Sequence, residues 1–173
     1  MNQQNLSQPV FLEIQRLRSP LVWVLLSIAV IAIWVTLISQ LLPNNFLGDD
    51  VMPTPLLIVF WLLFGIGLPA IFLFGNLRTA VRGDGIYVRF WPFHFSDRKM
   101  PFTEIARCEV REYKPVREYG GWGIKCGKGG WSYTMSGNRG VQLEFTDGKR
   151  LLIGSQRADE LGHAIQSRLP TQR

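Results

Sequence analysis

The sequence of 173 residues has few of the side chains from which metal centres are built. It contains two cysteines, Cys108 and Cys126, and two histidines, His94 and His163. None of the four stands at the short spacing that metal ligands require. Cys108 is expected to be a small buried thiol, and Cys126 falls in a glycine-rich loop. We therefore expect neither a metal nor any other cofactor.

Charge is almost absent from the first 75 residues. Their charged side chains are Glu13, Arg16, Arg18, Asp49 and Asp50. Two long apolar runs, residues 21–42 and 56–75, contain no charged residue, and as helices each would reach roughly 30 Å, the thickness of a bilayer core. Residues 20–75 are thus predicted to form a transmembrane hairpin. The lack of ionisable groups in both runs argues against an ion or proton pathway.

Two other interpretations of these runs are less consistent with the sequence. A cleaved signal peptide would have an apolar core of about 7–15 residues, shorter than residues 21–42, and a small-x-small cleavage site, which is missing. Two buried helices of a soluble protein would need the rest of this short chain to cover many large apolar side chains, and it is too small to do so.

Basic residues are missing from the segment between the two runs. Residues 43–55 contain no Lys or Arg, only Asp49 and Asp50. The outer ends of the runs are flanked by Arg16, Arg18, Arg78, Arg82 and Arg89. The positive-inside rule then predicts a two-pass protein of the cytoplasmic (inner) membrane, with both termini in the cytoplasm and the short loop outside.

The segment before the first run is predicted to be an amphipathic helix. At helical spacing, residues 9–19 place their apolar side chains on one face and most polar ones on the other. The apolar set is Val10, Phe11, Ile14 and Leu17, and the polar set is Glu13, Gln15, Arg16 and Arg18. Residues 1–19 are thus expected to be a tail and a lead-in lying in the membrane interface.

Residues 76–173 are predicted to form one cytoplasmic domain made mostly of strands. The strand candidates are residues 77–82, 86–90, 95–100, 106–112, 131–136, 141–146 and 150–153. Alternation such as Cys108 and Val110 against Arg107 and Glu109 is typical of an antiparallel sheet with one solvated face. From Ala158 the apolar spacing becomes helical. The expected fold class is α+β: two transmembrane helices, then an antiparallel barrel or sandwich of about seven strands with a C-terminal helix.

Several stretches carry a resemblance to a known family. They are FLEIQR at 11–16, MPFTEI at 100–105, GWGI at 121–124, SGNRGV at 136–141 and IGSQR at 153–157. With the order of the elements, they resemble an uncharacterised prokaryotic two-span membrane protein family with a bacterial pleckstrin-homology-like (PH-like) domain. The resemblance implies this fold and a membrane location. It implies no activity, because such folds bind lipids, peptides or proteins.

The glycine-rich loop at residues 119–131 is the most unusual feature of the domain. Its spacing fails the P-loop pattern, since Trp122 and Gly129 stand where glycine and Ser or Thr are needed. A long flexible hairpin that uses glycine for positive φ and close approach is the favoured interpretation. Basic and aromatic side chains around it form a speculative site for anionic headgroups. The candidate residues are Arg117, Trp122, Lys125, Lys128 and Arg139.

No catalytic motif is recognisable in the sequence, so we expect the protein not to be an enzyme. His94 alternates with Phe93 and Phe95 and is expected at the surface or a sheet edge. Residues 76–173 hold 17 Lys or Arg and 10 Asp or Glu, but the charges alternate, which argues against a nucleic-acid partner.

The expected function is a non-catalytic, membrane-anchored binding or scaffolding module. Its partners would be the lipid bilayer and either a protein or anionic lipid headgroups. The alternative is a structural membrane subunit that uses the domain as an oligomerisation collar, giving a homo-oligomer. An enzyme built on the glycine-rich loop is a third, weaker hypothesis.

Overall fold

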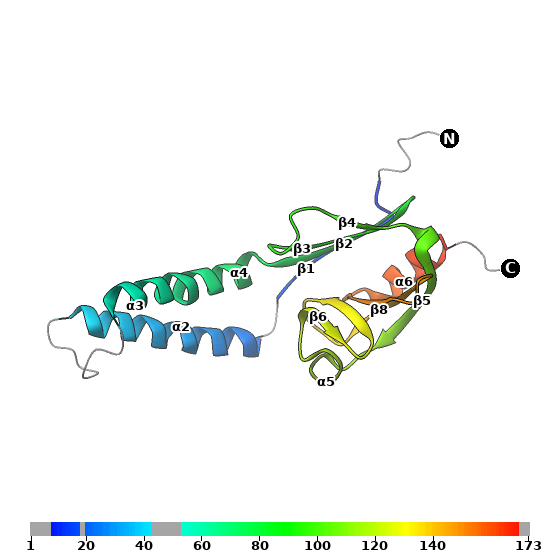
Figure 1. The fold of residues 1–173 in the computed structure, drawn as a ribbon. Coiled ribbons are helices and arrows are strands. Elements are labelled where there is room, and N and C mark those ends of the chain that lie inside the picture. Colours follow the sequence, from blue (N-terminus) through cyan, green and yellow to red (C-terminus); the bar gives the residue numbers. More distant parts are fainter. Residues whose placement is uncertain (1–7, 18–19, 43–52, 170–173) are drawn as a thin grey trace. The chain divides into compact units, whose positions relative to one another are not determined.

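The computed structural model describes residues 8–17, 20–42 and 53–169 (Figure 1). It divides into two compact units. The helical unit is Arg18–Gly75, and the β unit joins Met1–Leu17 to Asn76–Arg173. The expected tail before residue 8, Arg18 and most of the expected outward loop lie outside the described residues.

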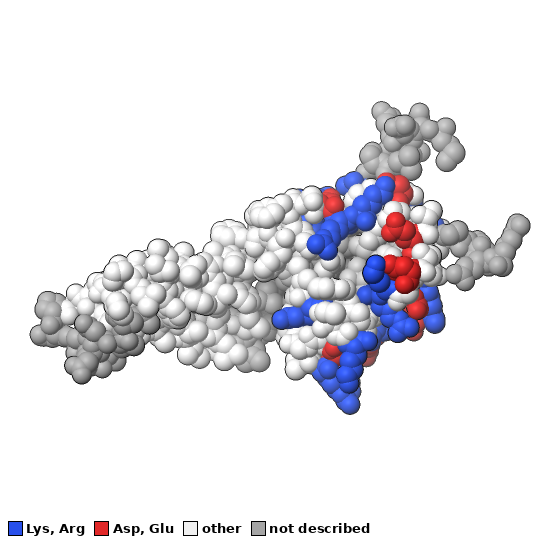
Figure 2. All heavy atoms as spheres, viewed as in Figure 1, with Lys and Arg blue, Asp and Glu red and all other residues white. Residues whose placement is uncertain are grey.

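The helical unit contains the two apolar helices predicted from the sequence. Its elements are α2 (Pro20–Leu41), α3 (Thr54–Phe60), the π-helical η1 (Trp61–Gly67) and α4 (Leu68–Phe74). Two segments, Val22–Leu41 and Thr54–Phe74, are long and apolar enough to cross a membrane. In Figure 2 the described part of this unit carries no Lys, Arg, Asp or Glu.

The second long helix is irregular around Pro69. Proline has no backbone N–H, and the wide turns of η1 directly precede it. Gly65 lies in η1, where an added Cβ would stand 2.9 Å from the Trp61 ring. The Trp34 and Trp61 rings meet edge to face at 5.0 Å. These two tryptophans therefore pack between the two helices.

Sheet A is an antiparallel four-stranded sheet in the order β1-β2-β3-β4. Its strands are β1 (Phe11–Arg16), β2 (Asn76–Arg82), β3 (Gly85–Trp91) and β4 (Arg98–Met100). The predicted lead-in helix is therefore wrong for the residues of β1. This strand pairs with β2 from Phe11↔Val81 to Arg16↔Asn76. β2 follows the helical unit in the sequence, and its pairing with this segment outweighs the helical spacing of the segment's apolar residues.

Sheet B has five strands in the order β5-β8-β9-β7-β6. They are β5 (Ile105–Glu112), β6 (Gly123–Gly127), β7 (Gly130–Thr134), β8 (Arg139–Phe145) and β9 (Arg150–Gly154). β7 runs parallel to β9, and the other pairs are antiparallel. The described residues thus form nine strands in two open sheets. This corrects the expected number of about seven strands and, of the two expected forms, rules out the closed barrel. The two unpredicted strands are β1 and β6.

Three short helices accompany the sheets. They are η2 (Phe102–Glu104), α5 (Pro115–Tyr119) and α6 (Ala158–Gln166). Leu161 and Ile165 of α6 are fully buried in the main core, so the predicted closing helix is confirmed. Gly162 lets α6 approach β5, because a Cβ there would stand 2.3 Å from the Val110 side chain. The core lies between α6 and the inner faces of both sheets.

Candidate functional site

The five side chains predicted to form a headgroup site come from separate elements of the β unit. Arg117 belongs to α5, Trp122 to the connection after it, Lys125 to β6, Lys128 to the β6–β7 turn and Arg139 to the start of β8. All five are exposed.

Two of these five side chains have structural partners. The Trp122 ring N–H donates to the Gly137 carbonyl at 2.8 Å, two residues before Arg139. Both Nη atoms of Arg139 donate to the Asp159 carboxylate at 3.0 Å. The charge of Arg139 is thus already matched by α6.

The glycines of residues 119–131 serve packing in the described structure. Gly120 ends α5 in the left-handed conformation, with φ of 74°. A Cβ on Gly127 would stand 2.2 Å from the Glu118 carbonyl oxygen. At Gly130, φ is +91° and a Cβ would lie 2.3 Å from the Arg150 carbonyl oxygen. The interpretation as a hairpin that needs glycine for turns and close approaches is therefore confirmed.

Arg111 holds α5 against the outer face of sheet B. Its guanidinium donates to Gln142 Oε1 at 3.1 and 3.2 Å, to Glu118 Oε2 at 2.9 Å and to the Tyr119 hydroxyl at 3.2 Å. The Lys114 backbone N–H and Arg111 together lower the pKa of the Glu118 carboxyl, with the backbone bond contributing most. The charges of Arg111 and Glu118 are therefore used to attach α5 to sheet B.

A buried polar latch ties β1 to the segment between β9 and α6. Ser155 Oγ and the Gln156 backbone N–H donate to the Glu13 carboxylate at 2.6 and 3.0 Å. Gln15 Nε2 donates to the Gly154 carbonyl at 2.7 Å. Glu13 and Gln15 are both buried, although the predicted helix would have placed them on its polar outer face. Hydrogen bonds compensate for the burial of Glu13 and of the Gln15 Nε2 group, whereas Gln15 Oε1 is buried without a partner.

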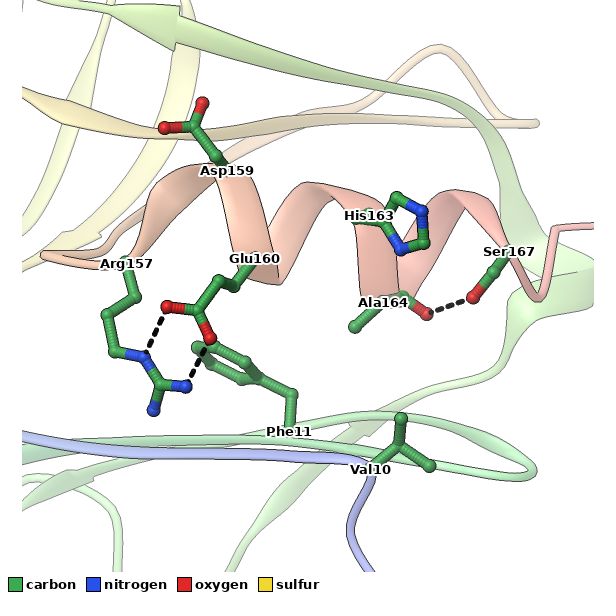
Figure 3. A pocket seen from close by; sticks show the side chains of 8 residues that line it. All are labelled: Val10, Phe11, Arg157, Asp159, Glu160, His163, Ala164 and Ser167. Carbon is green, nitrogen blue, oxygen red and sulfur yellow. Dashed lines mark hydrogen bonds and ion pairs between the residues drawn. The ribbon is translucent and has the colours of Figure 1, made fainter.

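A groove of about 650 Å³ lies between the start of β1 and α6 (Figure 3). Its lining residues are Val10, Phe11, Arg157, Asp159, Glu160, His163, Ala164 and Ser167. Arg157 lies 5.1 Å from the centroid of the Phe11 ring and forms a two-pronged ion pair with Glu160. The Ser167 hydroxyl donates to the Ala164 carbonyl at 3.2 Å. In the groove the charges of Arg157 and Glu160 thus pair with each other, and the Ser167 hydroxyl donates to the backbone. None of these three groups is an activated nucleophile.

The chain between β3 and β4 forms an aromatic turn, which we define as residues 91–95. Trp91, Phe93 and Phe95 are 38%, 60% and 81% exposed, whereas His94 is buried. The sequence correctly suggested that His94 and the two phenylalanines face opposite ways. The prediction that His94 lies at the surface is wrong, because His94 packs edge to face on the core residue Tyr133. Burial, with the nearby Arg98 charge, lowers the pKa of His94.

Neither cysteine has a metal-binding neighbourhood among the described residues, where no group of three His, Cys, Asp or Glu could hold a metal ion. Both thiols are free. Burial raises the pKa of Cys108 to about 12, which makes it unreactive at neutral pH. Cys126 is exposed at the end of β6.

A model of the family described as "Family of unknown function (DUF6141)" matches residues 3–171. The chain belongs to this family. No curated protein matches the chain. No solved structure matches it either.

In this member of DUF6141 the surfaces differ in what remains available for binding. The groove and the outer face of sheet B present side chains that already pair with one another. The aromatic turn instead leaves large apolar surface exposed. Its period-two pattern, Trp91, Phe93 and Phe95, was visible in the sequence, but the sequence could not tell which side of that pattern faces the core.

Proposed function

We propose that this protein is a two-span protein of the cytoplasmic membrane that holds a non-catalytic binding module at the cytoplasmic face. The observation that carries the proposal is the pairing of β1 with β2. β1 precedes the first apolar helix and β2 follows the second. All of β1 pairs with β2, from Phe11↔Val81 to Arg16↔Asn76. Strands that pair lie on the same side of a membrane, so the helical unit between them crosses it an even number of times.

The same pairing counts against removal of the first helix as a signal peptide. Cleavage after that helix would also remove β1. This strand supplies Phe11 to the main core and the buried polar groups of Glu13 and Gln15. A strand that completes the β unit is expected to remain in the mature protein.

The exposure of the helices supports a bilayer rather than a protein environment. Only 11% of each apolar window is buried within the described structure. A core helix of a soluble protein would be mostly covered by its own chain. The distribution of arginine, with Arg16 before the first helix and Arg78, Arg82 and Arg89 after the second, favours the cytoplasm for the β unit.

A PH-like fold for the β unit is part of the proposal. Sheet A supplies four antiparallel strands, β5, β8 and β9 form an antiparallel set of three, and α6 closes the core. The β6–β7 hairpin is then an insertion that attaches to β9 through the parallel pairing. A binding role, rather than catalysis, is supported by the use of charged groups such as Arg111 and Arg139 in structural pairs.

Thiol accessibility tests the topology. The exposed native Cys126 reports on the β unit. In a Cys126→Ser background, Gln8→Cys reports on the segment before the first helix. In the same background, Asn45→Cys reports on the segment that connects the two helices. An impermeant maleimide should label positions 8 and 126 only in inside-out vesicles and position 45 only in right-side-out ones. Labelling of positions 8 and 126 from opposite sides would refute the proposal, as would release of the chain by carbonate.

Crosslinking in native membranes tests the binding role against the oligomerisation collar. A binding module should give discrete products with other proteins or with lipid. A ladder of homo-oligomers alone would instead favour the collar. Retention of a nucleotide or another substrate by the purified chain would favour an enzyme.

A further inference from the structure

Two hydrogen bonds fix the conformation of the aromatic turn. The Phe90 N–H donates to His94 Nδ1 at 3.3 Å, and the His94 N–H donates to the Phe90 carbonyl at 2.7 Å. With His94 held inward in this way, Phe93 and Phe95 on either side of it point outward. Turning these rings into the core would break both hydrogen bonds.

Two of the exposed rings contact each other, and the third contacts a buried ring of β3. Trp91 and Phe95 meet edge to face at 5.7 Å, and Phe93 lies 5.9 Å from the buried Phe90. Contiguous aromatic surface of this kind on a folded domain marks a contact site with lipid or protein. Tryptophan in particular favours the headgroup layer of a membrane.

Chain connectivity places the turn close to the end of the second apolar helix. Trp91 pairs directly with Asn76, and Asn76 is separated from the last helical residue, Phe74, only by Gly75. Two Cα steps of about 3.8 Å and one strand pairing of about 5.5 Å separate Trp91 from Phe74 by at most roughly 13 Å. This limit holds for any orientation of the β unit, because it depends only on covalent bonds and on pairing within sheet A.

Positive charge lies beside the aromatic turn. Arg78 and Arg89 are cross-strand partners, two rows along β2 and β3 from the pair of Asn76 and Trp91. They share one carboxylate, that of Asp97, at 4.0 and 3.6 Å. Arg16, the exposed last residue of β1, pairs with Asn76. Two arginines for one acid, with a third nearby, give this end of the sheet a net positive charge, which suits phosphate groups at a bilayer surface.

From these observations we infer that the aromatic turn inserts into the headgroup layer of the cytoplasmic leaflet, with Arg16, Arg78 and Arg89 facing the lipid phosphates. This inference rests on the proposed two-span topology and names the bilayer surface as the ligand of sheet A. It gives the β unit a second attachment to the membrane besides its covalent links. The five residues predicted from the sequence as a headgroup site have no part in it.

Fluorescence quenching in liposomes tests the inference on the full chain. A Cys126→Ser background, which keeps the buried Cys108, receives either Phe95→Cys or the control Val116→Cys. Val116 in α5 is 71% exposed, comparable to Phe95, so both substitutions should leave folding unchanged. Each thiol carries an environment-sensitive dye, and the protein is reconstituted in phosphatidylglycerol–phosphatidylethanolamine vesicles. The quenchers are headgroup nitroxide lipids and, separately, iodide on both sides of the bilayer.

If the aromatic turn inserts, the two quenchers should rank residues 95 and 116 in opposite orders. At residue 95, lipid nitroxide should quench several-fold more strongly than at residue 116, and iodide several-fold less. Iodide quenching at residue 95 as strong as at residue 116 would overturn the inference and favour a protein as the occupant of the turn. A carbonate wash of the same vesicles separates this failure from that of the topology, because a chain that washes off was never inserted.

Discussion

The edge strand β5 of sheet B turns charged side chains outward and apolar ones inward, whereas the edge strand β1 of sheet A does the reverse. On β5, Arg107 and Glu109 are exposed and Cys108 is buried. On β1, Leu12 and Ile14 are 41% and 58% exposed, while Glu13 and Gln15 are buried. The buried carboxylate of Glu13 is tolerated because Ser155 and Gln156 donate to it, and Gln15 donates to the last residue of β9, Gly154.

The comparison shows that two sheets of one small domain can have different surroundings. Sheet B has an outer face suited to water, with ion pairs such as Arg150–Glu144. Sheet A exposes the aliphatic side chains Leu12 and Ile14 of β1 and the rings of the aromatic turn, beside the arginines Arg78 and Arg89. Polar groups inside and apolar groups outside suit a surface that contacts something other than water.

The largest effect should come from the apolar residue of β1 that faces the core. Phe11→Ala is expected to reduce the free energy of unfolding by about 3–4 kcal/mol, because it leaves a cavity. The outward neighbour Leu12→Ala should cost about 0.5 kcal/mol. Denaturant unfolding of the full chain in detergent measures both. Equal losses would show that β1 is not an integral strand of the β unit.

The buried latch should show the next largest effect. Glu13→Ala leaves the Ser155 hydroxyl and the Gln156 N–H without an acceptor, which should cost about 2 kcal/mol. The matched change in sheet B, Glu109→Ala, removes an exposed ion pair with Arg107 and should cost no more than about 0.5 kcal/mol. The same unfolding assay distinguishes them, and a larger loss at Glu109 would contradict the burial pattern.

The outward arginines of the two sheets should also differ in how much they contribute to the free energy of unfolding. Arg111→Lys loses the planar fork that bonds Gln142, Glu118 and Tyr119, and should cost about 1 kcal/mol. Arg78→Lys changes a single 4.0 Å ion pair and should be nearly neutral, within about 0.5 kcal/mol. A costly Arg78→Lys in detergent would mean that Arg78 serves the fold, and would weaken its assignment to lipid.

The smallest effect concerns pH. The pKa of His94 lies below its ordinary value of 6.5, so the unfolded chain binds more protons than the folded chain over that interval. The stability contributed by neutral His94 is therefore present above about pH 6.5 and is lost as pH falls through the folded pKa. His94→Asn should flatten the acid side of the curve of melting temperature against pH, and the same change at exposed His163 is the matched control. Identical curves for both variants would contradict the inward position of His94.

Local patterns in the sequence were sufficient for much of the fold. The regular alternation of residues 106–112 corresponds to β5, and the turn signal Asp147-Gly148 lies between β8 and β9. The apolar spacing of Leu161 and Ile165 corresponds to α6. The two uncharged runs correspond to the apolar helices. In each case, neighbours in the sequence suffice to set the period of burial.

The parts that were missed depend on contacts between distant segments. Residues 10–14, which include the start of β1, are apolar at 10, 11, 12 and 14. This pattern fits a helical face as well as a strand, and only the pairing with β2 decides between them. β6 is short and rich in glycine, and it forms because β7 pairs with it and α5 packs close to Gly127. The placement of Arg117, Trp122, Lys125, Lys128 and Arg139 as a lipid site remains a prediction.

The sequence by itself determined that two uncharged helices interrupt a chain whose remainder forms strands and one closing helix, because hydropathy and period are properties of neighbouring residues. The tertiary structure decided which side faces the core in β1 and in the aromatic turn. It buried Glu13 and His94 and exposed Leu12 and Phe95, since burial of a polar group depends on partners such as Ser155 and Phe90 that only the folded chain brings within hydrogen-bonding distance.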